Sequence, residues 1–297
     1  MNKQLKTLFL LLTINIFWFA KLQAAPLTFN TALPVSTGES ILREQLLVIQ
    51  SGDDPSGMNR DRTQVDIAST LVYGITPDLA IFGSVPYTDR RFKSMDGSTR
   101  LSQGLGDSKL FARYTIYKDD FQGGSFRIAP FTGVKLPTGD DNEQDVFGLL
   151  PANVQTGSGT WDTFGGLVAT YGSVDWEVDA QLSYQVNNKA NNFEKGNSSR
   201  ADISFQYRLF PETLSVNTEY FINGVLEANF IKNERNRTAD VVEFNSGGST
   251  LFLVPGLQYV FERYIVEVSL QVPVAQNLNG SALENNYVFR TGFRINF

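Results

Sequence analysis

Three carboxylates stand at alternate positions of segment 174–186: Asp175, Glu177 and Asp179. In a β-strand, residues two apart share a face, so these side chains would lie next to one another. Paired carboxylates can act as general acid and base, but the sequence supplies no partner for such chemistry. It contains no histidine and no cysteine, which excludes Ser-His and Cys-His nucleophilic catalysis and histidine-ligated metals. We therefore predict no enzyme, no cofactor and no metal site.

The carboxylates occupy one face of an expected strand whose other face is apolar. Apolar side chains stand at every second position from Val174 to Val186. Residues 287–297 repeat the pattern, with an aromatic face opposite one that carries two arginines and an asparagine. Strands of about ten residues that are apolar outward and polar inward are typical of transmembrane β-barrels. In a barrel, the carboxylates would point into the lumen.

Twelve strand-like segments run from residue 38 to residue 297, separated in alternation by five short and six long connections. Outer-membrane barrels have an even number of strands, short periplasmic turns and long extracellular loops. A closed barrel also pairs its backbone polar groups in hydrocarbon without leaving an edge. We therefore predict an all-β fold, a transmembrane antiparallel β-barrel of about 12 strands over residues 25–297, in a bacterial outer membrane with both termini periplasmic. Ten and fourteen strands are the alternatives.

The first 24 residues have the features of a secretory signal peptide. Lys3 and Lys6 precede the apolar run Leu8–Ala20, which is too short for a membrane-spanning helix, and small residues follow at Ala24 and Ala25. We predict cleavage after Ala24, with an uncleaved anchor helix as the alternative. Cleavage leaves 22 basic and 31 acidic residues. An acidic chain is a poor binder of nucleic acid.

Charged and aromatic side chains at inward positions are the candidate functional residues. An inward charge could select solutes, or opposite charges could fill the lumen with ion pairs, because an unpaired buried charge costs free energy. We expect Arg127 or Arg208 to face the carboxylates of segment 174–186. The charged candidates are Asp107, Lys109, Arg113, Arg127, Lys135, Asp175, Glu177, Asp179, Arg208, Glu219, Glu267, Arg290 and Arg294.

Aromatic rings occur on both faces of the expected strands. Six inward rings would form a path for apolar cargo or fill space: Phe82, Phe111, Phe131, Phe164, Phe221 and Phe252. Outward rings near strand ends predict girdles at the membrane interfaces; they include Tyr73, Tyr171, Trp176, Tyr184, Tyr207, Tyr220, Tyr259, Phe261 and Tyr264. The last strand resembles the signal that the barrel-assembly machinery reads in outer-membrane proteins, on the residues Tyr287, Phe289, Phe293, Ile295 and Phe297.

Four motifs carry a resemblance to a known family. They are Tyr73–Leu79 (YGITPDL), Gly104–Asp107 (GLGD), Lys135–Gly139 (KLPTG) and Thr156–Asp162 (TGSGTWD), in this order. Together they resemble the outer-membrane transporter family named for the meta-pathway of phenol degradation. The resemblance covers most of the chain after residue 24. It implies an outer-membrane β-barrel that passes small aromatic or apolar compounds.

We therefore predict an outer-membrane channel for passive diffusion of small solutes, with apolar or aromatic compounds as the expected cargo. Its expected partners are these solutes, outer-membrane lipid, lipopolysaccharide and the barrel-assembly machinery. The alternative is a structural or interaction barrel whose extracellular loops bind partners, chiefly through 137–159 and 225–248.

Overall fold

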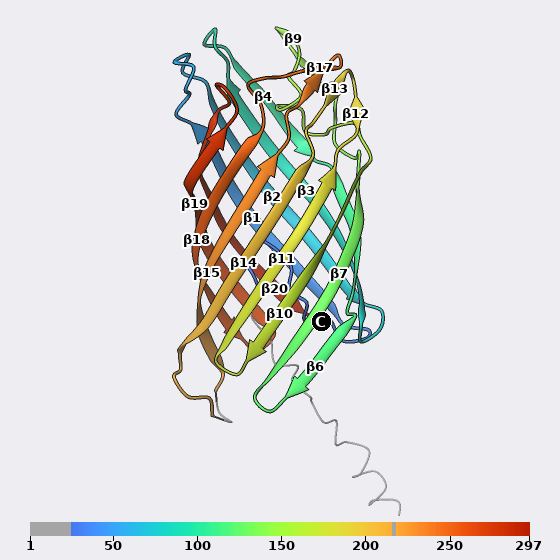
Figure 1. Ribbon diagram of the computed structural model, residues 1–297, viewed down its shortest axis with the longest axis vertical. Helices are drawn as coiled ribbons and strands as arrows, with labels where there is room; N and C mark the ends of the chain where they lie inside the picture. Colours follow the sequence, from blue (N-terminus) through green and yellow to red (C-terminus); the bar gives the residue numbers. More distant parts are fainter. Residues whose placement is uncertain (1–24, 216–217) are drawn as a thin grey trace, which may run out of the picture.

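The computed structural model describes residues 25–215 and 218–297, and these form a closed antiparallel β-barrel (Figure 1). The predicted signal peptide, residues 1–24, lies outside the described residues. In the described part of the chain, no helix is long and apolar enough to cross a membrane.

The wall has 12 strands, as predicted. One of them is interrupted: β3 pairs first with β4 and then with β5, while β7 pairs first with β5 and then with β6. These three segments are β4 (Thr99–Leu105), β5 (Ser108–Tyr114) and β6 (Tyr117–Phe121). The other wall strands are β1 (Ser40–Gly52), β2 (Asp61–Gly74), β3 (Leu79–Lys93), β7 (Gly124–Leu136), β10 (Asp162–Ser173), β11 (Trp176–Val186), β14 (Ser198–Phe210), β15 (Tyr220–Asn233), β18 (Gly248–Phe261), β19 (Tyr264–Leu278) and β20 (Glu284–Asn296).

The barrel closes where β20 pairs with β1. Ile41 lies opposite Asn296, and the pairing continues to the far ends of both strands. Beyond the ladder, the Phe297 N–H donates to the Ser40 carbonyl at 2.8 Å. The closed ladder gives the backbone of the wall strands partners on both sides, as hydrocarbon requires, except that the segments β4 and β6 of the interrupted strand each pair with one neighbour only.

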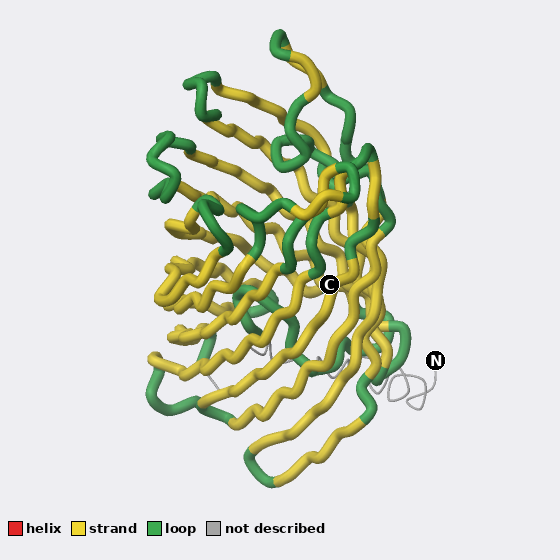
Figure 2. Tube along the Cα trace, turned by 45° about the horizontal axis from the view of Figure 1, so that its top comes forward, coloured by secondary structure: helices red, strands yellow, loops and turns green. Residues whose placement is uncertain are grey.

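Short connections gather at one end of the barrel and mostly longer ones at the other, and we name these the turn end and the loop end. Loop segments crowd the loop end (Figure 2). Two of its loops contribute a small sheet of β12 (Lys189–Ala190), β13 (Phe193–Glu194), β16 (Arg237–Thr238) and β17 (Val241–Val242), and a third contains the hairpin β8 (Gln144–Asp145) and β9 (Gly148–Leu149).

The predicted start of loop 225–248 was wrong. The sequence placed the loop from residue 225 onward, but β15 runs from Tyr220 to Asn233. The second half of β15 carries the polar residues Glu227 and Asn229 on its inward face. Because polar residues are typical of loops, the sequence predicted a loop there. Both are buried, and Glu227 lies opposite Ser204 in the ladder with β14. The contacts with neighbouring strands thus determine where β15 lies.

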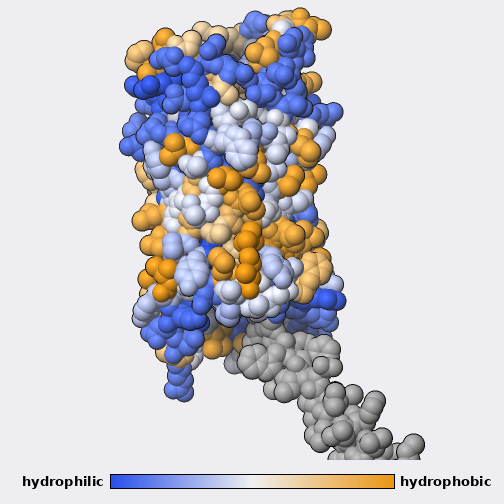
Figure 3. Space-filling model, turned by 90° about the vertical axis from the view of Figure 1, so that its right-hand side faces the viewer, coloured by the Kyte–Doolittle hydropathy of each residue, from blue (hydrophilic) through white to orange (hydrophobic). Residues whose placement is uncertain are grey.

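The outer surface is apolar around its middle, and hydrophilic residues cover the loop end (Figure 3). Alternation along β11 explains this surface: Glu177, Asp179 and Gln181 are buried, whereas Ala180 and Leu182 are exposed. As predicted, outward aromatic rings follow the turn end. Successive centroids lie 5.1–5.7 Å apart in two rows, Phe121–Tyr171–Trp176 and Phe210–Tyr220–Tyr259–Phe261–Tyr264.

Candidate functional site

The N-terminal segment, residues 25–38, crosses the lumen before the first strand begins. At its start, the Gln258 amide of β18 donates to the Ala25 carbonyl at 2.8 Å. At its end, the Gly38 N–H donates to the Gly74 carbonyl of β2 at 2.8 Å. Between them, the apolar side chains of the segment are buried: Leu27, Phe29, Ala32, Leu33 and Val35. The segment therefore fills the turn-end half of the lumen.

Glutamate and arginine side chains of the wall bind the backbone at the start of this segment. The Leu27 N–H donates to Glu227 Oε1 at 2.6 Å, and the Thr28 hydroxyl donates to Glu227 Oε2 at 2.5 Å. Arg43 Nη2 donates to the Leu27 carbonyl at 2.9 Å and to Glu267 Oε1 at 2.7 Å. Each of these buried carboxylates thus finds the partners that burial demands.

Arg113 binds the middle of the segment from the opposite wall. Its guanidinium donates to the carbonyls of Thr31 and Leu33 and lies 5.1 Å from the centroid of the Phe82 ring. The side chain is only 3% exposed. Its charge is therefore satisfied by two backbone carbonyls of the segment and by an aromatic face.

The three acidic residues of segment 174–186 separate into two environments. Asp175 lies in the turn before β11 and is exposed. It pairs with Arg208, which is one of the two arginines expected to face these carboxylates. Glu177 and Asp179 are buried and share the Gln206 amide, which donates to them at 3.2 and 3.1 Å.

Asp179 also links the wall to the N-terminal segment through a hydroxyl relay. It accepts a hydrogen bond from Thr170 Oγ1. That oxygen in turn accepts the Ala32 N–H at 2.7 Å and lies 3.0 Å from Thr31 Oγ1.

The wall makes room for the segment where a glycine faces inward. A Cβ on Gly256 of β18 would lie 2.3 Å from Leu27 Cδ1, and one on Gly74 would lie 2.2 Å from the Ser36 carbonyl oxygen. Only a residue without a side chain permits such close approach.

Four of the predicted inward phenylalanines form one cluster on the loop-end side of the segment. Phe82 and Phe111 stack with centroids 4.4 Å apart, and Phe111 makes edge contacts with Phe131 at 6.2 Å and Phe164 at 5.7 Å. Ala32 of the segment packs against this cluster. Phe111 and Phe164 are only half-buried, and because they face inward, their open ring surface belongs to the lumen.

The family described as "Putative MetA-pathway of phenol degradation" matches residues 56–274. The chain belongs to this family. The four motifs named above lie within the barrel wall or in the connections next to it.

A solved structure with a TM-score above 0.5 has the same fold, and two others show a weaker likeness. The COG4313 outer membrane channel from Pseudomonas putida F1 is 14% identical, with a TM-score of 0.67 over 93% of this chain and 100% of that one. The beta domain of the Bordetella autotransporter BrkA is 12% identical, with a TM-score of 0.48 over 88% of this chain and 100% of its own. The CymD monoaromatic hydrocarbon channel is 8% identical, with a TM-score of 0.40 over 89% of each chain. No functionally curated protein matches the sequence.

Three of the family motifs meet at the loop end. Asp107 of the GLGD motif accepts the Gly139 N–H at 3.2 Å and the Ser158 N–H at 3.0 Å, and Lys135 Nζ lies 3.2 Å from its carboxylate. Lys135 also pairs with Asp162, its neighbour across the β7–β10 ladder. The motifs therefore join loop 137–161 to the wall, and their spacing reflects this junction.

The other predicted inward residues are placed as follows. Arg290 and Arg294 face the lumen from β20, and Arg294 lies 3.8 Å from Glu267. Arg127 pairs with Asp120 of β6, not with the carboxylates of β11. Phe221 packs against Val260 and Ile265 near the turn end, and Phe252 is buried on β18; neither belongs to the phenylalanine cluster.

Two predicted lumen residues were wrong. Glu219 is exposed in the connection before β15, because that strand begins only at Tyr220. Asp175 likewise precedes β11 and is 57% exposed at the rim.

Sequence reasoning missed several polar lumen residues, of which Glu227, Asn229 and Gln258 are buried and Arg43 is half-buried. Arg43, Glu227, Asn229 and Gln258 were not among the candidates, although all four touch the N-terminal segment. One feature of the sequence could have identified them: each stands on the same face of its strand as another polar residue.

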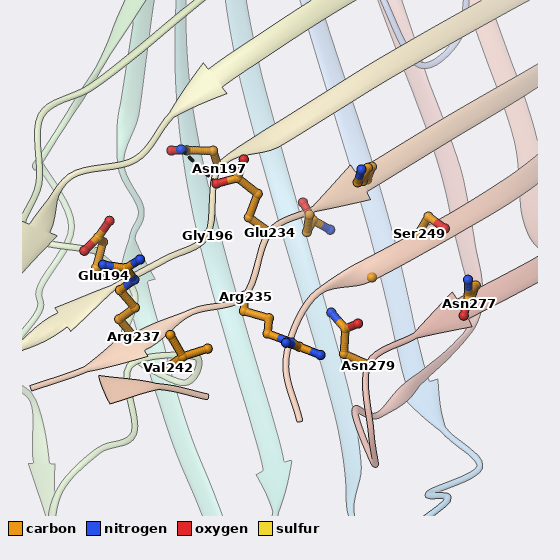
Figure 4. A pocket seen from close by; sticks show the side chains of 13 residues that line it. Glu194, Gly196, Asn197, Glu234, Arg235, Arg237, Val242, Ser249, Asn277 and Asn279 are labelled. Atoms are coloured by element: carbon orange, nitrogen blue, oxygen red, sulfur yellow. Dashed lines mark hydrogen bonds between the residues drawn. The ribbon is translucent and has the colours of Figure 1, made fainter. Parts of the chain in front are cut away.

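A polar cavity of about 670 Å³ opens at the loop end between the small sheet and the rims of β15, β18 and β19. Asn197 Nδ2 donates to Glu234 Oε2 at 3.0 Å on one side of it, and Arg235 and Asn279 lie on the other (Figure 4). Its lining carries both signs of charge.

Proposed function

We propose that this protein is an outer-membrane channel through which small apolar or aromatic solutes diffuse passively. The observation that carries this proposal is the cluster of inward phenylalanines whose rings Phe111 and Phe164 remain open to the lumen. Phenyl rings bind apolar solutes through burial of surface and through edge or offset ring contacts. A channel needs binding that is favourable enough for entry and weak enough for release, which a small aromatic cluster supplies.

We further propose that the turn end and both termini face the periplasm. The short connections and the row of outward aromatic rings at that end support this orientation. The outward residues of the last strand, including Phe289, Phe293 and the 61% exposed Phe297, would then be available to the barrel-assembly machinery from the periplasmic side. Lipopolysaccharide would surround the loop end.

In this orientation the N-terminal segment closes the periplasmic half of the lumen. A solute that reaches the phenylalanine cluster from outside meets Ala32 of the segment. Passage along the barrel axis therefore requires the segment to move. Besides its apolar contacts, the segment is held by hydrogen bonds that Arg43 and Arg113 donate and that Glu227 accepts, and water can replace these bonds.

The occluded lumen also supports a second function, a structural or interaction barrel whose loops meet partners. A permanently fixed segment would favour this function, because the lumen would then serve only as a core.

Uptake of an aromatic probe separates the two functions. N-phenyl-1-naphthylamine is excluded by lipopolysaccharide and fluoresces when it reaches phospholipid, so its rate of fluorescence increase in Gram-negative cells reports passage across the outer membrane. We expect cells that produce this protein to take up the probe faster than cells without it, and Phe164→Ser to reduce the gain more than Phe164→Leu. Equal rates with and without the folded, heat-modifiable protein would refute the channel and favour the interaction barrel.

A further inference from the structure

Basic side chains gather in the lumen on the loop-end side of the phenylalanine cluster. Arg62 and Arg90 face inward from β2 and β3, Lys109 from β5 and Arg200 from β14. Lys195, exposed in the connection before β14, experiences repulsion from Arg62, Arg90 and Lys109. Lys109 is likewise repelled by Arg200. These five residues, which we call the basic cluster, come from far apart in the sequence and act on one region of the lumen.

The nearby carboxylates compensate this charge only in part. Asp107 and Asp162 both pair with Lys135, and Asp202 pairs with Arg200 of the cluster at 3.0 Å. Asp66 accepts two hydrogen bonds from the neutral Gln64 amide and attracts Arg62 and Arg90, and Glu143 attracts Arg90.

Four members of the cluster have no described carboxylate within ion-pair distance, although Arg62 donates to Gln64 Oε1 at 3.3 Å and Arg90 donates to the Gln155 carbonyl. Within residues 25–215 and 218–297, no ion pair is formed by Arg62, Arg90, Lys109 or Lys195. The Nε atoms of Arg62, Arg90 and Arg200 are buried and have no hydrogen-bond partner in the same part of the chain. Arg62 and Arg90 are half-buried and Lys109 and Lys195 are exposed to the lumen or the loop end. Like charges that face one region repel, and an anion or water relieves this repulsion. The arrangement therefore favours an anion.

The basic cluster adjoins the aromatic one. Lys109 Nζ lies 5.8 Å from the centroid of the Phe164 ring. Phe111 follows Lys109 on the inward face of β5 and contacts the same ring. A ligand that reaches the half-buried rings of Phe111 and Phe164 therefore has an ammonium group at the edge of its binding surface.

We propose that the lumen between the N-terminal segment and the loop end contains a binding site for small aromatic carboxylates. The aromatic ring of the ligand packs on Phe111 and Phe164, and its carboxylate is held by Lys109 together with the unpaired cations of the basic cluster. This site rests on the proposed function, because it defines a charged class within the aromatic cargo. A negatively charged group meets the basic cluster first from outside, which concentrates such ligands at the mouth.

The test is calorimetric titration of the detergent-folded protein with benzoate, benzyl alcohol and acetate. These probes share the ring, the carboxylate or both. We expect saturable binding of benzoate and at least tenfold weaker binding of the other two. Lys109→Met should weaken benzoate binding at least tenfold, and Lys109→Arg should restore most of it. Phe164→Leu should weaken benzoate while leaving acetate unchanged.

Lys118→Met is the matched control, because Lys118 is 53% exposed at the turn end and pairs with Asp78. Equal affinities for benzoate and acetate, or equal effects of Lys109→Met and Lys118→Met, would overturn the proposal. Absence of benzoate binding to the heat-modifiable wild type would overturn it as well. The probe uptake described above uses a neutral compound, so failure of the channel and failure of the anion site give different results.

Discussion

Replacement of Arg113 by methionine should release the N-terminal segment. The substitution keeps much of the side-chain volume and removes the guanidinium that donates to the carbonyls of Thr31 and Leu33. A hydrogen bond from a charged donor contributes about 1.5 kcal/mol at the lower end of the measured range, and the lower end applies because water rebinds the carbonyls of a released segment. Losing two such bonds weakens the closed state by about 3 kcal/mol, which corresponds to roughly a hundredfold change in the equilibrium between closed and open.

Single-channel recording in planar bilayers measures this equilibrium. We expect wild-type protein to spend nearly all its time in a low-conductance state, and Arg113→Met to show discrete, ohmic openings with an open fraction up to about a hundredfold larger. Arg127→Met is the control. Within the described residues, its side chain donates to Asp120 and to carbonyls of β6 and β7. Equal open fractions in the two variants would refute the assignment of the segment as a closure held by Arg113.

A reversible lock tests the same assignment in the opposite direction. The hydroxyl oxygens of Thr31 and Thr170 lie 3.0 Å apart, and the chain contains no cysteine of its own. The double variant Thr31→Cys/Thr170→Cys places two sulfurs within reach of a disulfide. Oxidation should abolish openings, and a reductant should restore them. Openings that persist in the fully oxidised protein would contradict a moving segment.

Three further results are expected. Gly256→Val should raise the open fraction, because its Cβ would lie 2.3 Å from Leu27 Cδ1. Gly83→Val is the control and should leave the open fraction unchanged, because a Cβ there meets no atom within 4 Å. Similar open fractions in both variants would contradict this prediction. Lys135→Met should lower the free energy of unfolding by about 3 kcal/mol, measured by urea-dependent heat modifiability, because it leaves two largely buried carboxylates unpaired. Benzoate affinity should fall severalfold from pH 7 to pH 9. Restricted solvation and neighbouring cations lower the pKa of Lys195 to about 8. Above that pH, the ammonium that attracts the benzoate carboxylate is lost. A Lys195→Met variant should lose this pH dependence.

The barrel could be predicted from the sequence because each wall strand has one face towards the lumen and the other towards the outside along its whole length. In β11, the period of two separates Glu177 and Asp179 in the lumen from Ala180 and Leu182 on the outside. The pattern fails where both faces carry polar groups. In β1, Arg43 faces the lumen while Glu44 faces outward and accepts a hydrogen bond from Ser69 at 2.8 Å. This explains the weak alternation of that strand and the omission of Arg43.

The N-terminal segment could not be placed from its own residues. It has no strand period, and its partners stand far away in the sequence: Thr28 bonds to Glu227, 199 positions later, and Ala32 to Thr170, 138 positions later. A segment of this kind follows the shape of a lumen that only the closed wall creates. The same reason applies to the basic cluster, whose members Arg62, Arg90 and Lys195 come together only when loops and strands are in position.

The charged contacts of the lumen also constrain how the channel opens. If the segment moved out and left a dry lumen, Arg113 and Glu227 would lose hydrogen-bond partners, and an unpaired buried charge such as that of Arg113 would cost several kcal/mol. An apolar solute cannot replace these hydrogen bonds, but water can. Displacement of the segment must therefore admit water to the turn-end half of the lumen. It follows that the Arg113→Met variant should pass small ions whenever it is open, even when no aromatic solute is present. Faster uptake of the aromatic probe by that variant without any gain in ion conductance would show that the solute leaves the phenylalanine cluster by a route that keeps the segment in place.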